Sequence, residues 1–260
     1  MTFSQLELYD INGMKDTEPL DLASKMSSGK KTVFSFSVYG NVNKYVGGLL
    51  ENCKDINRLY PEFWIYVYLG NDFDQSIITN NFSGIRNLKL IQTNYSGHKC
   101  MVQRFITIDD ADVSVSFSRD CDSRINERDQ YCINTFLASN KKFQIIRDHI
   151  AHDTEILGGL WGIRKGLLPY NIRVLLEEYE TNFDVCNFWS DQLFLRRCIY
   201  PLVKDDCIIF DPYRHYTVET VHEIPVPYKE VYGCRDHAGF IHMPVNLNNP
   251  FGEHGPRYEI

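Results

Sequence analysis

The sequence predicts an α/β fold in which a mixed, mostly parallel central sheet is flanked by helices. Residues 32–38 alternate apolar and small polar side chains, as a strand does. Residues 63–69 form an unbroken apolar run that ends at Gly70, which is typical of a strand buried on both faces. A helical pattern lies between them, and strand–helix–strand is the unit from which parallel sheets are built.

The remaining elements follow in order along the chain. The helix after the first strand is ended by Pro61, and its apolar face consists of Tyr45, Val46, Leu49, Leu50, Cys53 and Ile56. Further strands are predicted at 87–91, 112–118, 143–147 and 207–210, and helices at 101–108, 126–139, 171–180 and 190–200. Residues 157–162 form a glycine-rich segment. The expected division is an irregular N-terminal lead-in (1–30), one domain (31–244) and a C-terminal tail (245–260).

Composition favours one large domain and argues against nucleic acid as a partner. The 260 residues are 43% hydrophobic, which supports a sizeable core. The formal charge of -7 leaves no basic excess to neutralise a phosphate backbone. No stretch reaches the roughly 20 apolar residues of a transmembrane helix, and the N-terminus lacks signal-peptide features. The 8 cysteines form no CxxC pair, so reduced thiols and a cytoplasmic location are expected.

The strongest functional signal is Asp120-Cys121-Asp122 at the carboxyl end of the strand predicted at 112–118. In open α/β sheets, ligands bind at the carboxyl ends of strands. Two carboxylates one residue apart can converge on one hard cation, and Mg²⁺ or Mn²⁺ keeps positions open for substrate phosphates. Because such a pattern also arises by chance, an ordinary acidic turn is the alternative. We expect Asp120 and Asp122 to bind Mn²⁺ or Mg²⁺.

The residues around this pair resemble the DxD region of GT-A glycosyltransferases, and the resemblance covers roughly residues 32–215. The stretches 147–153 and 156–164 are similar to segments of bacterial and large-DNA-virus proteins of this class. Ser190-Asp-Gln-Leu-Phe194 resembles the DQ motif that opens a helix in several such families. The chain departs from the pattern because it has no His-x-x-Gly-x-x-Lys-Pro-Trp segment, which supplies a metal ligand in some retaining families.

The resemblance implies roles for residues on several strands. Residues implied to bind the donor nucleotide are Ser37, Tyr39, Gly40, Asp72, Arg104, Asp120 and Cys121. Residues implied to face the sugar or the acceptor are His149, His152, Gly158, Gly159 and Trp161. Asp191 is implied to be catalytic, with Gln192 beside it. A carboxylate there would act as base for the acceptor hydroxyl or stabilise an oxocarbenium-like transition state.

Several of these roles have structural alternatives. Gly40 could simply end a strand, and Asp72 could lie in a solvated loop. Arg104 could be a surface arginine. Trp161 could belong to the core, with the two neighbouring glycines forming a bend. Asp191 could be the N-cap or a first-turn residue of a helix.

The third protein ligand of the metal is open among three residues. Asp211 is preferred, because it follows the strand at 207–210 directly and an acidic oxygen suits a hard cation. His215 and the more distant His237 are the fallbacks. The alternative for Asp211-Pro212 is the start of a turn.

Together these observations predict a divalent-metal-dependent glycosyltransferase. It would move a sugar from a nucleotide-sugar, by preference a UDP-sugar, to a hydroxyl of a glycan or other acceptor. Three alternatives stay open: a nucleotidyltransferase of related fold, a glycoside hydrolase using Asp120 or Asp122, and a non-catalytic sugar- or nucleotide-binding protein. The turn Tyr39-Gly40-Asn41 lacks the glycine- and Lys/Arg-rich signature that usually follows the first strand of nucleotidyltransferases.

Overall fold

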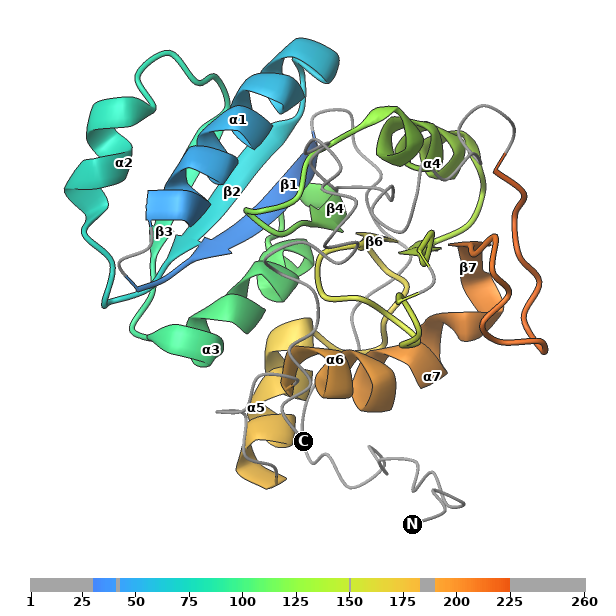
Figure 1. Ribbon diagram of the computed structural model, residues 1–260. Helices are drawn as coiled ribbons and strands as arrows, with labels where there is room; N and C mark the ends of the chain where they lie inside the picture. The colour runs from blue at the N-terminus through green and yellow to red at the C-terminus, as the bar shows by residue number, and fades with distance from the viewer. Residues whose placement is uncertain (1–29, 41–42, 150, 183–189, 225–260) are drawn as a thin grey trace, which may run out of the picture.

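A computed structural model describes residues 30–40, 43–149, 151–182 and 190–224, which form a seven-stranded sheet between two layers of helices (Figure 1). The strands are β1 (Lys31–Val38), β2 (Trp64–Leu69), β3 (Leu88–Gln92), β4 (Val113–Ser118), β5 (Phe143–Ile146), β6 (Trp161–Arg164) and β7 (Cys207–Phe210). Their order in the sheet is β3-β2-β1-β4-β6-β5-β7. The predicted mixed, mostly parallel α/β fold is confirmed.

Most strands of the sheet have their carboxyl ends at the same edge. β6 is antiparallel to β4 and β5, whereas the pairs β1–β2, β1–β4, β2–β3 and β5–β7 are parallel. The carboxyl ends of all strands except β6 therefore lie at one edge, together with the amino end of β6. Strands β2 and β3 lie on one side of β1, and the chain then crosses to β4 on its other side, so the strand order reverses at β1. A ligand site is expected at such a switch point, outside the carboxyl ends of β1 and β4.

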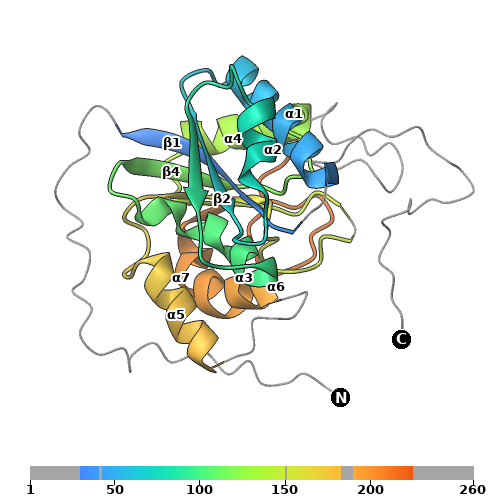
Figure 2. The same ribbon diagram turned by 90° about the vertical axis from the view of Figure 1, so that its left-hand side faces the viewer.

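Two apolar cores cover the two faces of the sheet, and helices lie on both sides of it (Figures 1 and 2). Alternation along β1 sends Phe34 and Phe36 into the first core and Val33 into the second. The helices over the first core are α1 (Asn43–Leu59), α2 (Gln75–Asn81) and α4 (Glu127–Ala138). Those over the second are α3 (Gly97–Met101), the 3-10 helix η2 (Val102–Asp109), α5 (Ile172–Asn182), α6 (Ser190–Phe194), the π-helical turn η3 (Leu195–Ile199) and α7 (Tyr200–Val203). A 3-10 turn, η4 (Lys204–Asp206), leads into β7.

Three elements differ from the sequence expectation. The glycine-rich segment ends in β6, a strand of four residues whose Gly162 leaves room for the ring of Phe117. The helix expected at 101–108 is the end of α3 followed by η2. Helix α2 was not expected, and its first turn is capped by Asp74, which accepts from the Ser76 amide. The lead-in to residue 29 and the tail at 245–260 lie outside the described residues.

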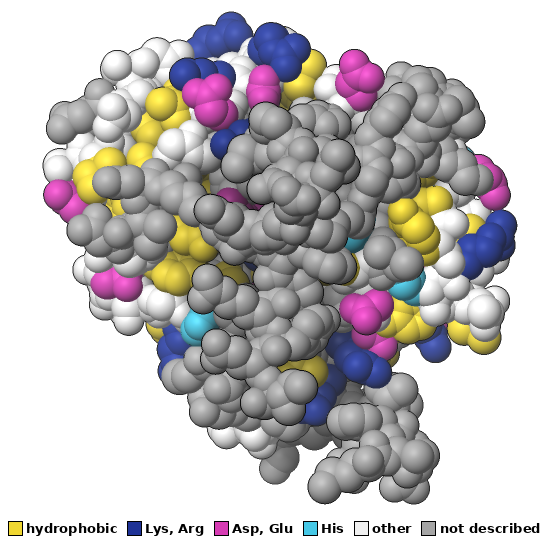
Figure 3. Space-filling view, viewed as in Figure 1, with side chains coloured by type: hydrophobic (Ala, Val, Ile, Leu, Met, Phe, Trp, Pro, Cys, Tyr) yellow, Lys and Arg dark blue, Asp and Glu magenta, His cyan; other side chains and the backbone are white. Residues whose placement is uncertain are grey.

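Charged side chains on the outside of the molecule are mixed in sign. On the face shown in Figure 3, Lys and Arg side chains of the described residues are spread around the periphery, with Asp and Glu among them. Within the described ranges, no helix combines the length and the apolar character needed to cross a bilayer.

Candidate active site

The register of β4 and β6 brings the aspartate pair against the glycine pair. Ser118 pairs with Trp161 across this antiparallel ladder. Continued by two residues, the same register sets Asp120 opposite Gly159. The Ser118 hydroxyl donates to the Gly158 carbonyl at 2.7 Å and secures this alignment beyond the last paired residues. Two motifs that the sequence suggested separately therefore meet at the carboxyl end of β4.

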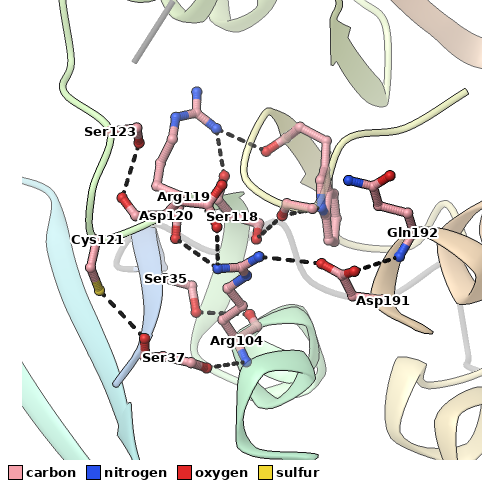
Figure 4. Close-up of polar contacts among 12 residues, drawn as sticks. Ser35, Ser37, Arg104, Ser118, Arg119, Asp120, Cys121, Ser123, Asp191 and Gln192 are labelled. Carbon is pink, nitrogen blue, oxygen red and sulfur yellow. Dashed lines mark hydrogen bonds and ion pairs between the residues drawn. The ribbon is translucent and has the colours of Figure 1, made fainter. Parts of the chain in front are cut away.

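Arg104 joins Asp120 to Asp191. Its Nη1 lies 2.6 Å from Asp120 Oδ1, and its Nη2 lies 3.7 Å from Asp191 Oδ2 (Figure 4). The arginine and Asp191 are buried, whereas the Asp120 side chain is 45% exposed. The surface-arginine alternative is therefore wrong for Arg104. The structure instead brings three of the predicted site residues together as one charged chain.

Strand β1 fixes the position of Arg104 through its backbone. The Ser35 hydroxyl donates to the Arg104 carbonyl at 2.8 Å, and the Arg104 amide donates to Ser37 Oγ at 3.2 Å (Figure 4). Helix η2 is thus bound to the switch-point strand on the side opposite α1. Ser37 was expected to line the nucleotide pocket, but its hydroxyl is buried and occupied by this bond. Its place in the structure is that of a support for Arg104.

The backbone of Gly158 and Gly159 packs closely against the side chains of Asp120, Arg104 and Asp191. A Cβ built on Gly158 would lie well under 3.0 Å from Asp191 Oδ2, and one on Gly159 well under 3.0 Å from Asp120 Oδ2. Real Cβ atoms do not approach other atoms so closely. Neither residue has a positive φ angle, so the constraint is one of space. At Gly159 it includes the backbone nitrogen of Asp120, whereas at Gly158 it comes from the side-chain ends of Asp191 and Arg104. The two glycines were predicted to let a sugar approach the backbone closely. In the structure, the carboxylates of Asp191 and Asp120 occupy the space beside them.

Cys121 alternates with the two aspartates and points into the protein. It is 4% exposed, and its Sγ donates to the Ser37 carbonyl at 3.4 Å. Burial raises the pKa of this thiol well above its usual value. The Cys121 side chain is enclosed by the core, so a contact of this residue with a donor nucleotide, which stays a prediction, would have to come from its backbone. It anchors the segment from which Asp120 and the exposed Asp122 emerge.

Two tyrosines that follow β1 share the electrostatic field of this site. Burial raises the pKa of Tyr39 to about 12, with further effects from Arg104, Tyr45, Asp120 and Asp191. The pKa of Tyr45 is raised by burial first and then by the charges of Asp122 and Asp120. Tyr45 was expected only as part of an apolar helix face, and its phenol is a site feature that the sequence analysis missed.

The carboxyl of Asp191 has an altered acidity. Burial raises its pKa, Arg104 lowers it, and the charge of Asp120 adds to the rise. Asp191 lies in the first turn of α6, where its Oδ1 accepts from the Gln192 amide at 2.8 Å (Figure 4). Asp191 is thus a first-turn residue of α6, with one carboxylate oxygen on the Gln192 amide and the other facing Arg104. Gln192 is half-buried next to it.

A second arginine supports the start of the Asp120 loop. Arg119 donates to both carboxylate oxygens of Asp129, at 2.8 and 3.1 Å, and both side chains are buried. Its Nη1 also donates to the carbonyls of Ser118 and Trp161, at 2.7 and 3.2 Å. A bidentate pair of this kind fixes geometry as well as charge. It ties the end of β4 to the start of both β6 and α4.

Trp161 belongs to the core rather than to a sugar site. It is 1% exposed, stacks on Phe143 with ring centroids 5.4 Å apart, and meets the edge of Phe105 at 5.4 Å. Its indole nitrogen donates to the Gly158 carbonyl at 3.1 Å. No face of the indole is left for a pyranose, so the expected sugar contact is wrong and the core alternative applies.

The histidines expected at the sugar site lie in another polar network, after β5. His149 is buried, and His152 Nδ1 lies 3.5 Å from Asp148 Oδ1. Burial lowers the pKa of His149, followed by the effect of His152. Among the electrostatic neighbours of His149 is His215, after β7. The role of this pair toward a sugar or acceptor stays a prediction.

Asp211 uses both carboxylate oxygens within the protein. It is 0% exposed; Oδ2 lies 3.2 Å from Arg147 Nε, and Oδ1 lies 2.8 Å from His215 Nδ1. The amides of Tyr213 and His215 also donate to it, so it organises a turn, as the alternative had it. In the described part of the chain, no three His, Cys, Asp or Glu residues gather closely enough to hold a metal ion. Asp211 and His215 therefore do not join Asp120 and Asp122, and His237 lies outside the described residues.

The two remaining donor-site residues lie at the rim. Gly40 has a φ of +67°, which favours glycine, and a side chain there would meet open space. Asp72 is exposed, and its Oδ2 accepts from the Gly97 amide at 3.4 Å. Both places agree with strand-end loops, and neither contradicts contact with a ligand.

The residues at the end of β4 fit a divalent cation that is completed by a ligand. Asp122 is exposed, and Asp120 is half-exposed with only Oδ1 bound to Arg104. Carboxylate oxygens are the donors that Mg²⁺ and Mn²⁺ prefer. A site with two carboxylates leaves most positions of the ion to phosphate oxygens and water, as is usual for Mg²⁺. The donor set therefore suits a metal–diphosphate complex rather than a bare metal.

Comparisons with known proteins gave matches only among solved structures. No protein-family model and no curated protein matches the sequence. The chain is similar to a mannosyltransferase from Pyrobaculum calidifontis in complex with GDP-Man and Mn²⁺, at 14% identity and a TM-score of 0.46. That match covers 81% of this chain and 61% of the other, so the chain spans less than two thirds of the mannosyltransferase.

Two further matches represent two kinds of enzyme. One is the galactosyltransferase LgtC in complex with donor and acceptor sugar analogues, at 15% identity, coverage of 83% and 84%, and a TM-score of 0.48. The other is 4-diphosphocytidyl-2C-methyl-D-erythritol synthase from Anaerococcus prevotii, at 16% identity, coverage of 74% and 92%, and a TM-score of 0.47. The matches include GT-A glycosyltransferases, the class that the sequence resembles. Because all these scores are below 0.5, the function is inferred from this chain's own site.

Proposed function

We propose that the protein is a glycosyltransferase that uses a nucleotide-sugar donor and a divalent cation. The observation that carries the proposal is the Asp120–Arg104–Asp191 chain at the switch point of the sheet, covered by Gly158 and Gly159. It sets an exposed acidic pair for cation binding next to a buried carboxylate of altered pKa. Cation and acid–base groups side by side are what transfer from a sugar diphosphate needs.

Each residue has a distinct task in this proposal. Asp120 and Asp122 hold Mn²⁺ or Mg²⁺, which would neutralise the charge that develops on the leaving diphosphate. Arg104 contacts both carboxylates. Because a guanidinium has five N–H donors, it can also donate to an oxygen of the diphosphate. Tyr39 and Tyr45 border the nucleotide. The donor is by preference a UDP-sugar, and the acceptor is a hydroxyl of a glycan or another molecule.

The bond changes of the reaction define the role of Asp191. The bond between the anomeric carbon and the diphosphate oxygen breaks, and its electron pair leaves with the nucleoside diphosphate. A bond forms between the anomeric carbon and the acceptor oxygen, and the acceptor hydroxyl loses its proton. Asp191 either accepts that proton or stabilises the positive charge on the sugar ring. Its burial beside Arg104 makes either interaction stronger than in water.

A nucleotidyltransferase is the second candidate. One of the matched structures is a diphosphocytidyl-methylerythritol synthase. Both reactions use a metal-bound nucleotide phosphate, and they differ in which bond breaks. The buried Asp191 favours the glycosyltransferase, because a nucleotidyl transfer reacts at the phosphate that the metal holds and needs no additional carboxylate beside a sugar carbon.

Binding of the nucleotide should depend on the metal and on both aspartates. We expect UDP to raise the melting temperature clearly with Mn²⁺ and only weakly in EDTA, because a ligand that binds the folded state stabilises it. Asp120→Asn and Asp122→Asn should each remove the Mn²⁺-dependent part of the shift. Asp205→Asn serves as the control, because this exposed aspartate precedes the amino end of β7, at the opposite edge of the sheet. Equal shifts in EDTA and in Mn²⁺ would reject the metal-dependent site.

A further inference from the structure

Helix α1 touches the aspartate loop through Asn52 and Gly48, which lie one turn apart on the same face of the helix. Asn52 is 1% exposed. Its Nδ2 donates to the Ser123 carbonyl at 2.9 Å and lies 3.5 Å from the carbonyl oxygens of both Asp120 and Cys121. One side-chain amide thus faces three backbone carbonyls of the segment that carries the Asp120 and Asp122 carboxylates. This segment, residues 120–123, is called the aspartate loop.

Gly48 gives the loop room to approach the helix. A Cβ at this position would lie well under 3.0 Å from the Cys121 carbonyl oxygen, so the helix backbone itself is in contact with the loop. The neighbouring Gly47 has nothing within 4 Å of the same hypothetical atom. Only one glycine of the pair is therefore required by packing. Arg124 completes the arrangement, because its Nη1 donates to the Cys121 and Ser123 carbonyls at 3.2 and 2.7 Å.

Both helix residues are unfavourable for the helix alone. The Oδ1 of Asn52 is buried without a hydrogen-bond partner, and an unpaired buried acceptor lowers stability. Glycine inside a helix lowers it as well, because the unfolded chain loses more freedom there. Both residues that lower the stability lie on one face of α1 and contact the same loop. A need to fix that loop accounts for both.

We propose that Asn52 and Gly48 are positioning residues that hold the aspartate loop in the orientation in which Asp120 and Asp122 bind the divalent cation. This inference rests on the proposed function for its metal. The two residues act on backbone carbonyls and do not touch the ligand. They correspond to the outer partners of a metal site, whose removal typically lowers metal affinity about 10- to 100-fold.

The loop can be tested without any ligand. We expect hydrogen exchange of the peptide covering residues 119–126 to be faster in Asn52→Leu and in Gly48→Ala than in the unsubstituted protein, while peptides from β2 stay unchanged. Gly47→Ala is the matched control, since it adds the same methyl group to the same helix in open space. Two different variants keep the test decisive if one of them fails to fold. Unchanged exchange in both variants would overturn the inference, whatever the function.

The metal affinity provides the second readout. In the presence of UDP, the apparent Kd for Mn²⁺ should rise about 10- to 100-fold in Asn52→Leu and Gly48→Ala, and stay within about twofold in Gly47→Ala. Faster exchange with unchanged Mn²⁺ affinity would overturn the positioning role. A failure of the unsubstituted protein to bind Mn²⁺ with any nucleotide would instead overturn the proposed function, and with it the metal part of this inference, while the exchange result would still decide the loop part.

Discussion

Asp191→Asn should lower the turnover number by about 10²- to 10⁴-fold, the range that general acid–base catalysis contributes, and leave the UDP affinity within about threefold. The asparagine side chain keeps an oxygen that can accept a hydrogen bond, so the bond to the Gln192 amide can persist. The substitution therefore removes the charge beside Arg104 and little else. Only interactions that are stronger in the transition state change the chemical rate.

The measurement is steady-state release of nucleoside diphosphate, together with a UDP titration and a melting curve for each variant. Gly47→Ala, in open space on α1, controls for the effect of an unrelated substitution. Full activity of Asp191→Asn would remove Asp191 from the mechanism. A variant that is unfolded at room temperature would show that the main role of Asp191 is structural, in the first turn of α6.

Gly159→Ala should abolish metal-dependent nucleotide binding. The added methyl group would occupy the space of Asp120 Oδ2 and approach the Asp120 backbone. Since the Ser118 hydroxyl holds the neighbouring Gly158 carbonyl, we expect the Asp120 carboxylate to turn away from Arg104 and from the cation. Overpacking of this kind typically costs about 1–3 kcal/mol of unfolding free energy, so the protein should still fold.

Isothermal titration of Mn²⁺ with UDP, and chemical denaturation, separate these two effects. Gly47→Ala is again the matched control, because it adds the same methyl group in open space. Replacement of a glycine by alanine in a helix should raise the free energy of unfolding by about 0.5–1 kcal/mol. Normal Mn²⁺-dependent UDP binding in Gly159→Ala would show that Asp120 does not need the space at Gly159, and would contradict the geometry described for the site.

Much of the fold follows from local patterns in the sequence. The apolar run before Gly70 and the alternation before Asp120 predicted β2 and β4 to within one residue at their carboxyl ends. Strand β6 was not predicted, because it has four residues and contains Gly162. Its register decides the site, since it carries Gly159 to Asp120. Pairing partners of short strands depend on long-range packing, which no local pattern contains.

The sequence identified several residues of the site, but not the contacts among them. Asp120, Arg104 and Asp191 were each expected at a ligand site, and the structure joins them through one guanidinium. Trp161 was assigned to the sugar because an indole suits a pyranose, whereas stacking on Phe143 buries it. Asn52 carried a signal that was overlooked: it is a polar residue at helical spacing from the inward-facing Leu49 and Ile56.

The products formed from a nucleotide-sugar test the central claim most directly. UDP-glucose, UDP-galactose and GDP-mannose are incubated with the protein in Mn²⁺ and in EDTA, with free monosaccharides and water as acceptors of the sugar, and nucleotides are separated by chromatography. A second reaction contains UTP and glucose 1-phosphate. The account predicts release of a nucleoside diphosphate from at least one nucleotide-sugar, only with metal, and its loss in Asp122→Asn. Pyrophosphate from the second reaction, without nucleoside diphosphate in the first, would contradict it and identify a nucleotidyltransferase.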